Sequence, residues 1–367
     1  MKKNAIFSVI SIFACLLIFN SSCENASIRE SSEDSTSFEP NTDTCLDTDY
    51  YAETVHIEEE KGEAIPIIVD VDVDVSRLND IKTIELSADG ENYNRIVEEW
   101  FLSNYPDAKI GGENAYSCGK AGSERFVQFG KDGLGNIYFI DTSKDINGRM
   151  EQGRPLFNGY ITKEIPLGMS INSETAEKEA IDFIKRFTAF DYRANKIIAV
   201  NDVEGNQGYY DIYLKAYING LPICVARNGD STLIPISLNY KLSSKGIISF
   251  DGNVNFKIVE TKALGNRVQI EPIVDQFIKD IETLASEEYD YSKAKVTVSV
   301  KDHKFVVNNI YLGYIPEKEK SSNSSVTLVP AWCFDYVDSR TENGEEIIIY
   351  FTVAYSVETG RWMGRFY

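Results

Sequence analysis

The sequence predicts an α+β fold in which helices pack on antiparallel sheets. Alternation of apolar and polar residues, the pattern of half-buried strands, recurs along most of the chain. Three other stretches carry apolar residues at helical spacing, and each is followed by several strand-like stretches separated by turn residues. Two or three helix-then-strands units are therefore expected, with the helices covering one face of curled sheets.

Residues 1–22 predict a signal peptide. Met1–Lys3 is basic, and the apolar run Ala5–Phe19 is about fifteen residues long, short of the ~20 that span a bilayer as a helix. Small residues then precede Cys23, although the position before them is Asn20 rather than an aliphatic residue. The order resembles a bacterial lipoprotein signal, so Cys23 is the expected lipidation site, carrying chains such as palmitate. A leader cleaved without lipidation and an uncleaved anchor are the alternatives.

Residues 23–63 are rich in Ser, Thr, Asp and Glu and hold few large apolar residues. Such a segment cannot bury enough surface to fold, so a disordered acidic tether is expected. The chain of 367 residues has a net charge of −20. This excess of acid repels phosphate backbones, which argues against nucleic acid as a partner.

An N-terminal α+β unit is expected over residues 64–168. Its first strand, Ile67–Val75, alternates valine with aspartate, which indicates valines inward and carboxylates outward. Tyr93–Ser103 has the apolar spacing of a helix and stops before Pro106. Strands at Arg125–Phe129 and Asn136–Asp141 follow, joined by a glycine-rich turn.

A second unit over 169–262 and a third over 263–367 repeat this order. Ser173 is the expected N-cap of one helix, and Pro272 stands in the first turn of the other, where a missing N–H costs little. The strands expected after the two helices are Lys196–Val200, Gly208–Ile218, Ser237–Lys241, Ile247–Phe250, Lys295–Val300, Asn308–Tyr314, Val326–Tyr336, Glu346–Tyr355 and Arg361–Phe366.

Three of these stretches, Ile67–Val75, Asn309–Tyr314 and Leu328–Trp332, resemble an uncharacterised family of clostridial lipoproteins. Its units are similar to the PepSY-like modules of exported regulators of a cell-wall sensor kinase, and the likeness covers residues 64 to 340. The family's Asn-Ala-Ile-Asp-Gly-type turn is replaced here by Val357–Gly360. The resemblance implies an accessory regulatory role without catalysis.

Asp70, Asp72 and Asp74 are the candidate cation ligands. A calcium loop that begins at Asp70 requires Gly and Glu where Val75 and Ile81 stand, so the acids are interpreted as a solvated strand face that blunts edge pairing. No metal or other cofactor is expected.

No catalytic residue is predicted. The two histidines are His56, at the margin of the tether, and His303, which is expected in a hairpin turn. Neither accompanies a Gly-x-Ser-x-Gly nucleophile motif, and a phosphate loop is also absent from the sequence. A cell-envelope hydrolase that uses paired carboxylates is the alternative function.

Trp332 and Trp362 are the candidate binding residues, because exposed indole rings stack on sugars and peptides. Core packing is the competing interpretation for Trp332, which lies within an apolar strand. Pro330, in the same strand, predicts a sheet edge or a bulge. An exposed edge there would accept a partner's strand.

Cys45, Cys118, Cys224 and Cys333 allow three disulfide pairings, among which the sequence does not choose. Cys224 and Cys333 stand in apolar strand-like runs and are expected to be buried, free and inert. Together these features predict a lipoprotein on the outer face of the cell membrane, a non-catalytic binding or accessory regulatory module. Its partners would be the membrane, through the lipid, and an envelope protein, peptide or glycan.

Overall fold

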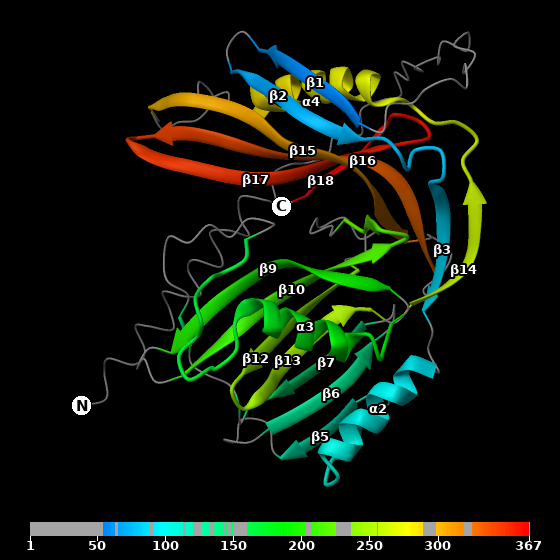
Figure 1. The fold of residues 1–367 in the computed structure, drawn as a ribbon, viewed down its shortest axis with the longest axis vertical. Helices are drawn as coiled ribbons and strands as arrows, with labels where there is room; N and C mark the ends of the chain where they lie inside the picture. The colour runs from blue at the N-terminus through cyan, green and yellow to red at the C-terminus, as the bar shows by residue number, and fades with distance from the viewer. Residues whose placement is uncertain are drawn as a thin grey trace. The chain divides into compact units, whose positions relative to one another are not determined.

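The computed structural model describes residues 54–62, 65–88, 92–112, 115–119, 126–132, 136–142, 144, 148–149, 160–188, 190–202, 207–224, 236–254, 256–288, 299–318 and 325–366. Of these, 59% lie in strands and 17% in three short helices. Residues 51–367 form one compact unit, which contains two sheets (Figure 1). The signal peptide, Cys23 and most of the expected tether lie outside the described residues.

The expected fold class, α+β with helices packed on antiparallel sheets in repeated units, is wrong. The described protein is β-rich, and one of its sheets is mixed rather than antiparallel. Alternation in the sequence identified most strands but not their lengths: β15 alone runs over Val300–Lys318 and β16 over Ser325–Glu342. Strand pairing is non-local, so the periodicity of a segment does not reveal its partner.

The first sheet has the order β1-β2-β15-β16-β17-β18, and β3 pairs with both β16 and β14. β2 runs parallel to β15, with Phe305 opposite Ile67 and Val307 opposite Val69, while the other pairs are antiparallel. The remaining strands of this sheet are β1 (Thr54–Lys61), β2 (Ile67–Asp74), β3 (Lys82–Ala88), β14 (Phe256–Ala263), β17 (Glu345–Ser356) and β18 (Trp362–Phe366).

The second sheet is antiparallel in the order β4-β5-β6-β7-β13-β12-β10-β9-β8, and β11 pairs with β10. Its strands are β4 (Lys109–Gly112), β5 (Ala115–Gly119), β6 (Phe126–Asp132), β7 (Asn136–Asp141), β8 (Gly148–Arg149), β9 (Asp191–Asp202), β10 (Gly208–Ile218), β11 (Leu221–Pro222), β12 (Ser237–Ser243) and β13 (Gly246–Asn253).

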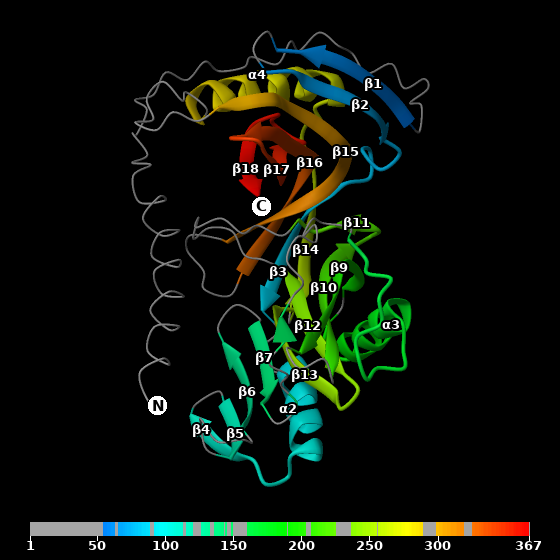
Figure 2. The same cartoon turned by 90° about the vertical axis from the view of Figure 1, so that its left-hand side faces the viewer.

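Figure 2 shows the helices α2 (Asn92–Asn104), α3 (Ser173–Ile184) and α4 (Ile270–Glu288). Aromatic side chains pack them against the sheets. Phe277 of α4 stacks on Phe334 of β16 with ring centroids 4.6 Å apart. Trp100 of α2 and Phe183 of α3 meet edge to face over the second sheet, at 5.0 Å. The N-cap of α3 is Asn172 rather than Ser173, because Asn172 Oδ1 accepts from the backbone N–H of Thr175 at 2.9 Å.

The chain is divided between the sheets differently from the three consecutive units expected at 64–168, 169–262 and 263–367. The first sheet combines β1–β3 with β14–β18, so both ends of the described chain contribute to it. β1, at Thr54–Lys61, also lies inside the range 23–63 expected to be disordered, and it pairs with β2 along its whole length. Backbone hydrogen bonds to β2 compensate for the low apolar content of β1.

Two local expectations about the first sheet were wrong. His303 lies within β15 rather than in a hairpin turn, at a register shift between Lys301 and Lys304. Pro330 lies in the central strand β16, not at a sheet edge. On one side of β16, residues up to Leu328 pair with β3 and residues from Ala331 pair with β17. Pro330 therefore stands where the partner changes, and no ladder N–H is needed there.

Among the residues that the structure describes, no helix combines the length and the apolar composition required to cross a membrane.

Replacement of Phe277 by Ala should lower the free energy of unfolding by about 3–5 kcal/mol, because its fully buried ring joins α4 to the first sheet. Urea unfolding followed by tryptophan fluorescence measures the loss. Lys279→Ala, at an exposed position of the same helix, is the control and should change stability by less than about 0.5 kcal/mol. Equal effects of the two substitutions would show that α4 does not depend on this contact.

Candidate functional site

A pocket of about 800 Å³ opens between β9–β11 of one sheet and β15–β17 of the other. Its wall holds charged residues of both signs, tyrosine rings and asparagine amides. Its polar lining includes Asp74, Arg77, Lys215, Tyr311, Asp335 and Thr352. A concave site with a few convergent polar groups is the usual form of a ligand site.

Strand alternation places these polar groups on the pocket side. In β10, Leu214 and Ala216 are buried in the core, so Lys215 between them points the other way. In β16, Cys333 and Asp335 share a face because they are two residues apart. Register then brings Thr352 of β17 directly opposite Asp335.

Four of these polar side chains, those of Lys215, Tyr311, Asp335 and Thr352, form a continuous hydrogen-bonded chain. Lys215 Nζ donates to Tyr311 Oη at 3.3 Å, and Tyr311 Oη donates to Asp335 Oδ1 at 3.4 Å. Thr352 Oγ1 also donates to Asp335 Oδ1. The Lys215 ammonium lies 5.2 Å from the centre of the Tyr311 ring, close enough for a cation–π attraction. A cation from one sheet is thus held by an anion and a ring from the other.

The charges in this chain shift one another's protonation. Burial raises the pKa of Asp335, and the Lys215 ammonium opposes that rise. Burial disfavours the ammonium of Lys215, but the negative charges of Cys224 and Asp335 outweigh it and raise the pKa of Lys215. Burial also raises the pKa of Tyr311 well above its usual range, so its hydroxyl stays protonated and able to donate.

Two thiols lie behind Tyr311. The Sγ atoms of Cys224 and Cys333 are 3.1 Å apart, and Cys224 Sγ is 3.8 Å from Tyr311 Oη. Both cysteines are buried and free, as expected from the sequence. Their proximity was not expected, because the two residues stand 109 positions apart.

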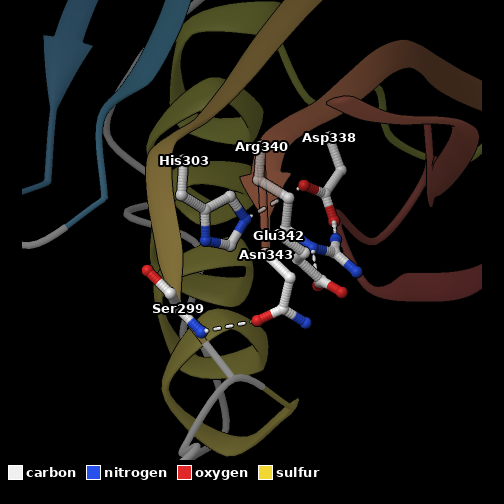
Figure 3. Close-up of polar contacts among 6 residues, drawn as sticks. All are labelled: Ser299, His303, Asp338, Arg340, Glu342 and Asn343. Carbon is white, nitrogen blue, oxygen red and sulfur yellow. Dashed lines mark hydrogen bonds and ion pairs between the residues drawn. The ribbon is translucent and has the colours of Figure 1, made fainter. Parts of the chain in front are cut away.

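A second polar cluster, shown in Figure 3, lies on β15 and β16. His303 Nε2 and Asp338 Oδ1 are 2.9 Å apart, and Arg340 Nη1 donates to Asp338 Oδ2 at 2.6 Å. Arg340 Nε donates in turn to Glu342. The Asp338 side chain is fully buried, so its charge needs these partners.

The histidine and aspartate of this cluster do not form a nucleophilic triad with the serine beside them. Ser299, as Figure 3 shows, offers its backbone N–H to Asn343 Oδ1 at 3.2 Å rather than its hydroxyl to His303. The cluster is therefore interpreted as an ionic network that joins two long strands. The sequence did not predict this network, since alternate positions on β16 do not reveal which residue of β15 faces them.

The candidate cation residues remain a solvated strand face. Asp70, Asp72 and Asp74 are exposed while Val69 and Val73 are fully buried, which confirms the predicted alternation. His56 of β1 bonds to Asp72 across the strand pair, with Nδ1 and Oδ1 3.0 Å apart. Within the described ranges, no group of three or more His, Cys, Asp or Glu side chains is arranged to hold a metal ion.

The two candidate binding tryptophans have different environments. Trp332 is fully buried and its Nε1 donates to the Val268 carbonyl at 3.0 Å, so it is a core residue and not a binding platform. Trp362 is 38% exposed, and its ring packs edge-on against Tyr355 at 5.5 Å. Neither lines the pocket.

Lys215→Met should destabilise the protein by about 2–3 kcal/mol at pH 7, because the buried Asp335 loses its cation. Removal of Lys215 raises the folded-state pKa of Asp335 further above its ordinary 3.8. A carboxyl whose folded-state pKa is raised contributes to stability at low pH, and this contribution is lost as the pH rises through the folded-state pKa. The cost should therefore be smaller at pH 4, as measured by urea unfolding at both values.

The exposed Lys257→Met on β14 is the control for this pH dependence. Its effect on the free energy of unfolding should be small at both pH values. A cost of Lys215→Met that is the same at pH 4 and pH 7 would show that Asp335 does not depend on Lys215.

Comparison with known proteins identifies a shared fold but no family. No family model matches the chain, and no curated protein matches it. A crystal structure of an uncharacterised protein from Eubacterium rectale aligns with a TM-score of 0.56 and 13% sequence identity. The alignment covers 85% of this chain and 96% of that one. At this identity the likeness extends to the fold alone.

Proposed function

We propose that this chain is an exported lipoprotein, anchored to the outer face of the cell membrane through Cys23, that binds a peptide or glycan fragment of the envelope without catalysis. The observation that carries the proposal is the pocket of about 800 Å³ in which Lys215, Tyr311 and Asp335 converge from both sheets. The leader-like residues 1–22 supply the argument for location.

The lining of the pocket suits a polar ligand with amide or hydroxyl groups. Arg77 and Lys215 provide positive charge, and Asp74 provides negative charge near the opening. Asn309 adds an exposed amide, and Tyr350 adds an aromatic face on which a sugar or peptide group packs. Mixed charge of this kind favours a zwitterionic or amide-rich ligand over a purely apolar one.

The alternative, a hydrolase that uses two carboxylates, receives less support from the pocket. Asp335 already accepts hydrogen bonds from Tyr311 and Thr352. The Ser76 hydroxyl and the Ser76 backbone N–H, which lies 2.9 Å from Asp74 Oδ1, both donate to Asp74 and lower its pKa. A paired-carboxylate mechanism requires both groups to face the scissile bond. Both acids are instead bound to the protein itself, which favours binding without bond cleavage.

An accessory regulatory role follows as part of the same proposal. The resemblance of Ile67–Val75 and Asn309–Tyr314 to clostridial lipoprotein modules implies such a role. Asp74, Asn309 and Tyr311 line the pocket, so both of these stretches contribute to the proposed ligand site. The module would then signal to an envelope partner whether a ligand occupies the pocket.

Asn309→Trp should weaken ligand binding at least about tenfold, because the larger side chain occupies the pocket. Isothermal titration with an N-acetylglucosamine tetramer and with a synthetic cell-wall stem peptide measures the Kd and distinguishes glycan from peptide. Lys304→Trp, exposed on the same strand β15 and outside the pocket, is the matched control and should bind as the parent does. Failure of the parent protein to bind either probe would contradict the proposed ligand class.

Cys23→Ala should abolish metabolic labelling with an alkyne-tagged palmitate and release the protein from the membrane fraction. A single acylated residue is the expected attachment, so no other substitution is needed. Cys118→Ala serves as the control and should keep the label. Persistence of label in the Cys23 variant would overturn the anchor.

A further inference from the structure

Two cysteine sulfurs lie close together where the two sheets meet. Cys224 follows β11, and Cys333 lies in β16. Their Sγ atoms are 3.1 Å apart, and both residues are almost completely buried, at 2% and 0% exposure. Two thiols brought this close from different sheets need only a small side-chain adjustment to reach bonding distance.

The backbone around the thiols is already held in place. The N–H of Cys224 donates to the Tyr314 carbonyl at 2.8 Å, and Ile223 forms a parallel bridge with Tyr314. On the other side, the N–H of Ile223 donates to the Ala216 carbonyl of β10 at 2.8 Å. The segment that carries Cys224 is therefore fixed to β10 and to β15 at once.

Gly313 leaves space for the two sulfurs. A Cβ atom at this position would lie 3.4 Å from Cys333 Sγ and 3.5 Å from Cys224 Sγ. The same Cβ would lie 3.0 Å from the Pro222 carbonyl oxygen, which is tighter than ordinary contact. Glycine at 313 thus allows β11 to approach the strands that carry it and Cys333. A side chain at 313 would press on the Pro222 carbonyl oxygen and displace β11.

We propose that Cys224 and Cys333 are a disulfide site: in the exported protein they join to form a bond that closes the junction of the two sheets behind the pocket. The proposal rests on the extracytoplasmic location given under the proposed function, because disulfides persist in oxidising compartments. The sequence-based expectation that both thiols are inert is replaced by this assignment.

The reaction is thiol–disulfide exchange with the disulfide of an envelope oxidoreductase, which reaches the two thiols while the sheets come together during folding, before both are buried. The Cys224 thiolate attacks one sulfur of that disulfide, whose bond breaks, and a mixed disulfide forms while the other sulfur leaves as a thiol. Cys333 then loses its proton and attacks Cys224 Sγ, which releases the second thiol. The protein pair gives up two electrons and two protons, and the oxidant's disulfide becomes two thiols.

The surroundings favour Cys224 as the attacking thiol. A hydrogen bond from Cys333 and the nearby Lys215 ammonium together lower the pKa of Cys224. Burial and the same hydrogen bond raise the pKa of Cys333 well above its usual range. The Lys215 ammonium, which lines the pocket, therefore also stabilises the thiolate of Cys224.

Peptide mapping of the full chain, expressed with its leader in a bacterial host, tests the proposal. Membranes are quenched in acid and denatured, and the free thiols are then alkylated with N-ethylmaleimide near neutral pH. The protein is digested without reductant before mass spectrometry. A peptide pair that links Cys224 to Cys333, 2 Da lighter than the two free peptides, is expected. Alkylation of both thiols in exported protein, or linkage of either one to Cys45 or Cys118, would overturn the proposal.

Two further measurements separate this proposal from the proposed function. Fractionation shows whether the chain is exported at all. If it is retained in the cytosol, the purified chain is unfolded and refolded with oxidised and reduced glutathione, because the folded protein buries both thiols. Linkage of the pair then supports the disulfide site although the proposed location is wrong, and absence of linkage overturns the site itself.

Thermal unfolding measures the consequence of the bond. Because 109 positions separate the two residues, dithiothreitol should lower the Tm of the oxidised protein by roughly 8–12 °C. The Cys224→Ala/Cys333→Ala double variant should show no dithiothreitol effect, whereas Cys118→Ala should keep it. A parent protein whose Tm does not respond to dithiothreitol would contradict a bond that closes this junction.

Discussion

The pairing of β15 with β16 is the interaction on which the rest of the structure depends. These two long antiparallel strands provide the partners for β2 on one side and for β3 and β17 on the other. Their register places Tyr311 opposite Cys333 and Asn309 opposite Asp335. A slip of one residue would turn both Asp335 and Cys333 to the other face of the sheet, where the pocket and the thiol contact could not form.

Polar groups are concentrated where the two sheets meet. Most of the interior is aliphatic and aromatic, yet Lys215, Asp335 and Tyr311 are brought together behind an open pocket. Partly buried charges are costly unless they are paired, and here Tyr311 bonds both to Lys215 of the other sheet and to Asp335 of its own sheet. Departure from an apolar core at one place is typical of a functional site, which is why we propose binding at this region.

The same residues connect ligand binding with redox chemistry. Lys215 lies on the pocket wall and also favours the thiolate of Cys224 behind it. When the two thiols join, Cys224 and Cys333 no longer contribute negative charge, and Asp335 remains among the groups that raise the pKa of Lys215. Oxidation would therefore make the pocket wall more positive, while the bond holds β11 against β16.

Within the described part of the chain, local sequence pattern predicted most of the strands and the three helices, because periodicity in one segment depends on which of its own faces is buried. The Val–Asp alternation of β2 is the clearest case, with Val69 and Val73 inside and Asp70 and Asp72 outside. The fold class was wrong because it depends on pairing between distant segments. Nothing in residues 67–74 indicates that they run parallel to β15 more than 200 positions later.

By itself, the sequence determined the acidic balance, the leader-like start at Met1–Cys23, the burial of Cys224 and Cys333, and the alternating faces of the strand Ile67–Val75. Only the tertiary structure decided that Cys224 meets Cys333, that Lys215 meets Asp335 through Tyr311, and that Pro330 stands at a change of strand partner. The physical reason is that side-chain direction follows from local backbone geometry, whereas contact between strands depends on register and on which segments pair across the whole chain.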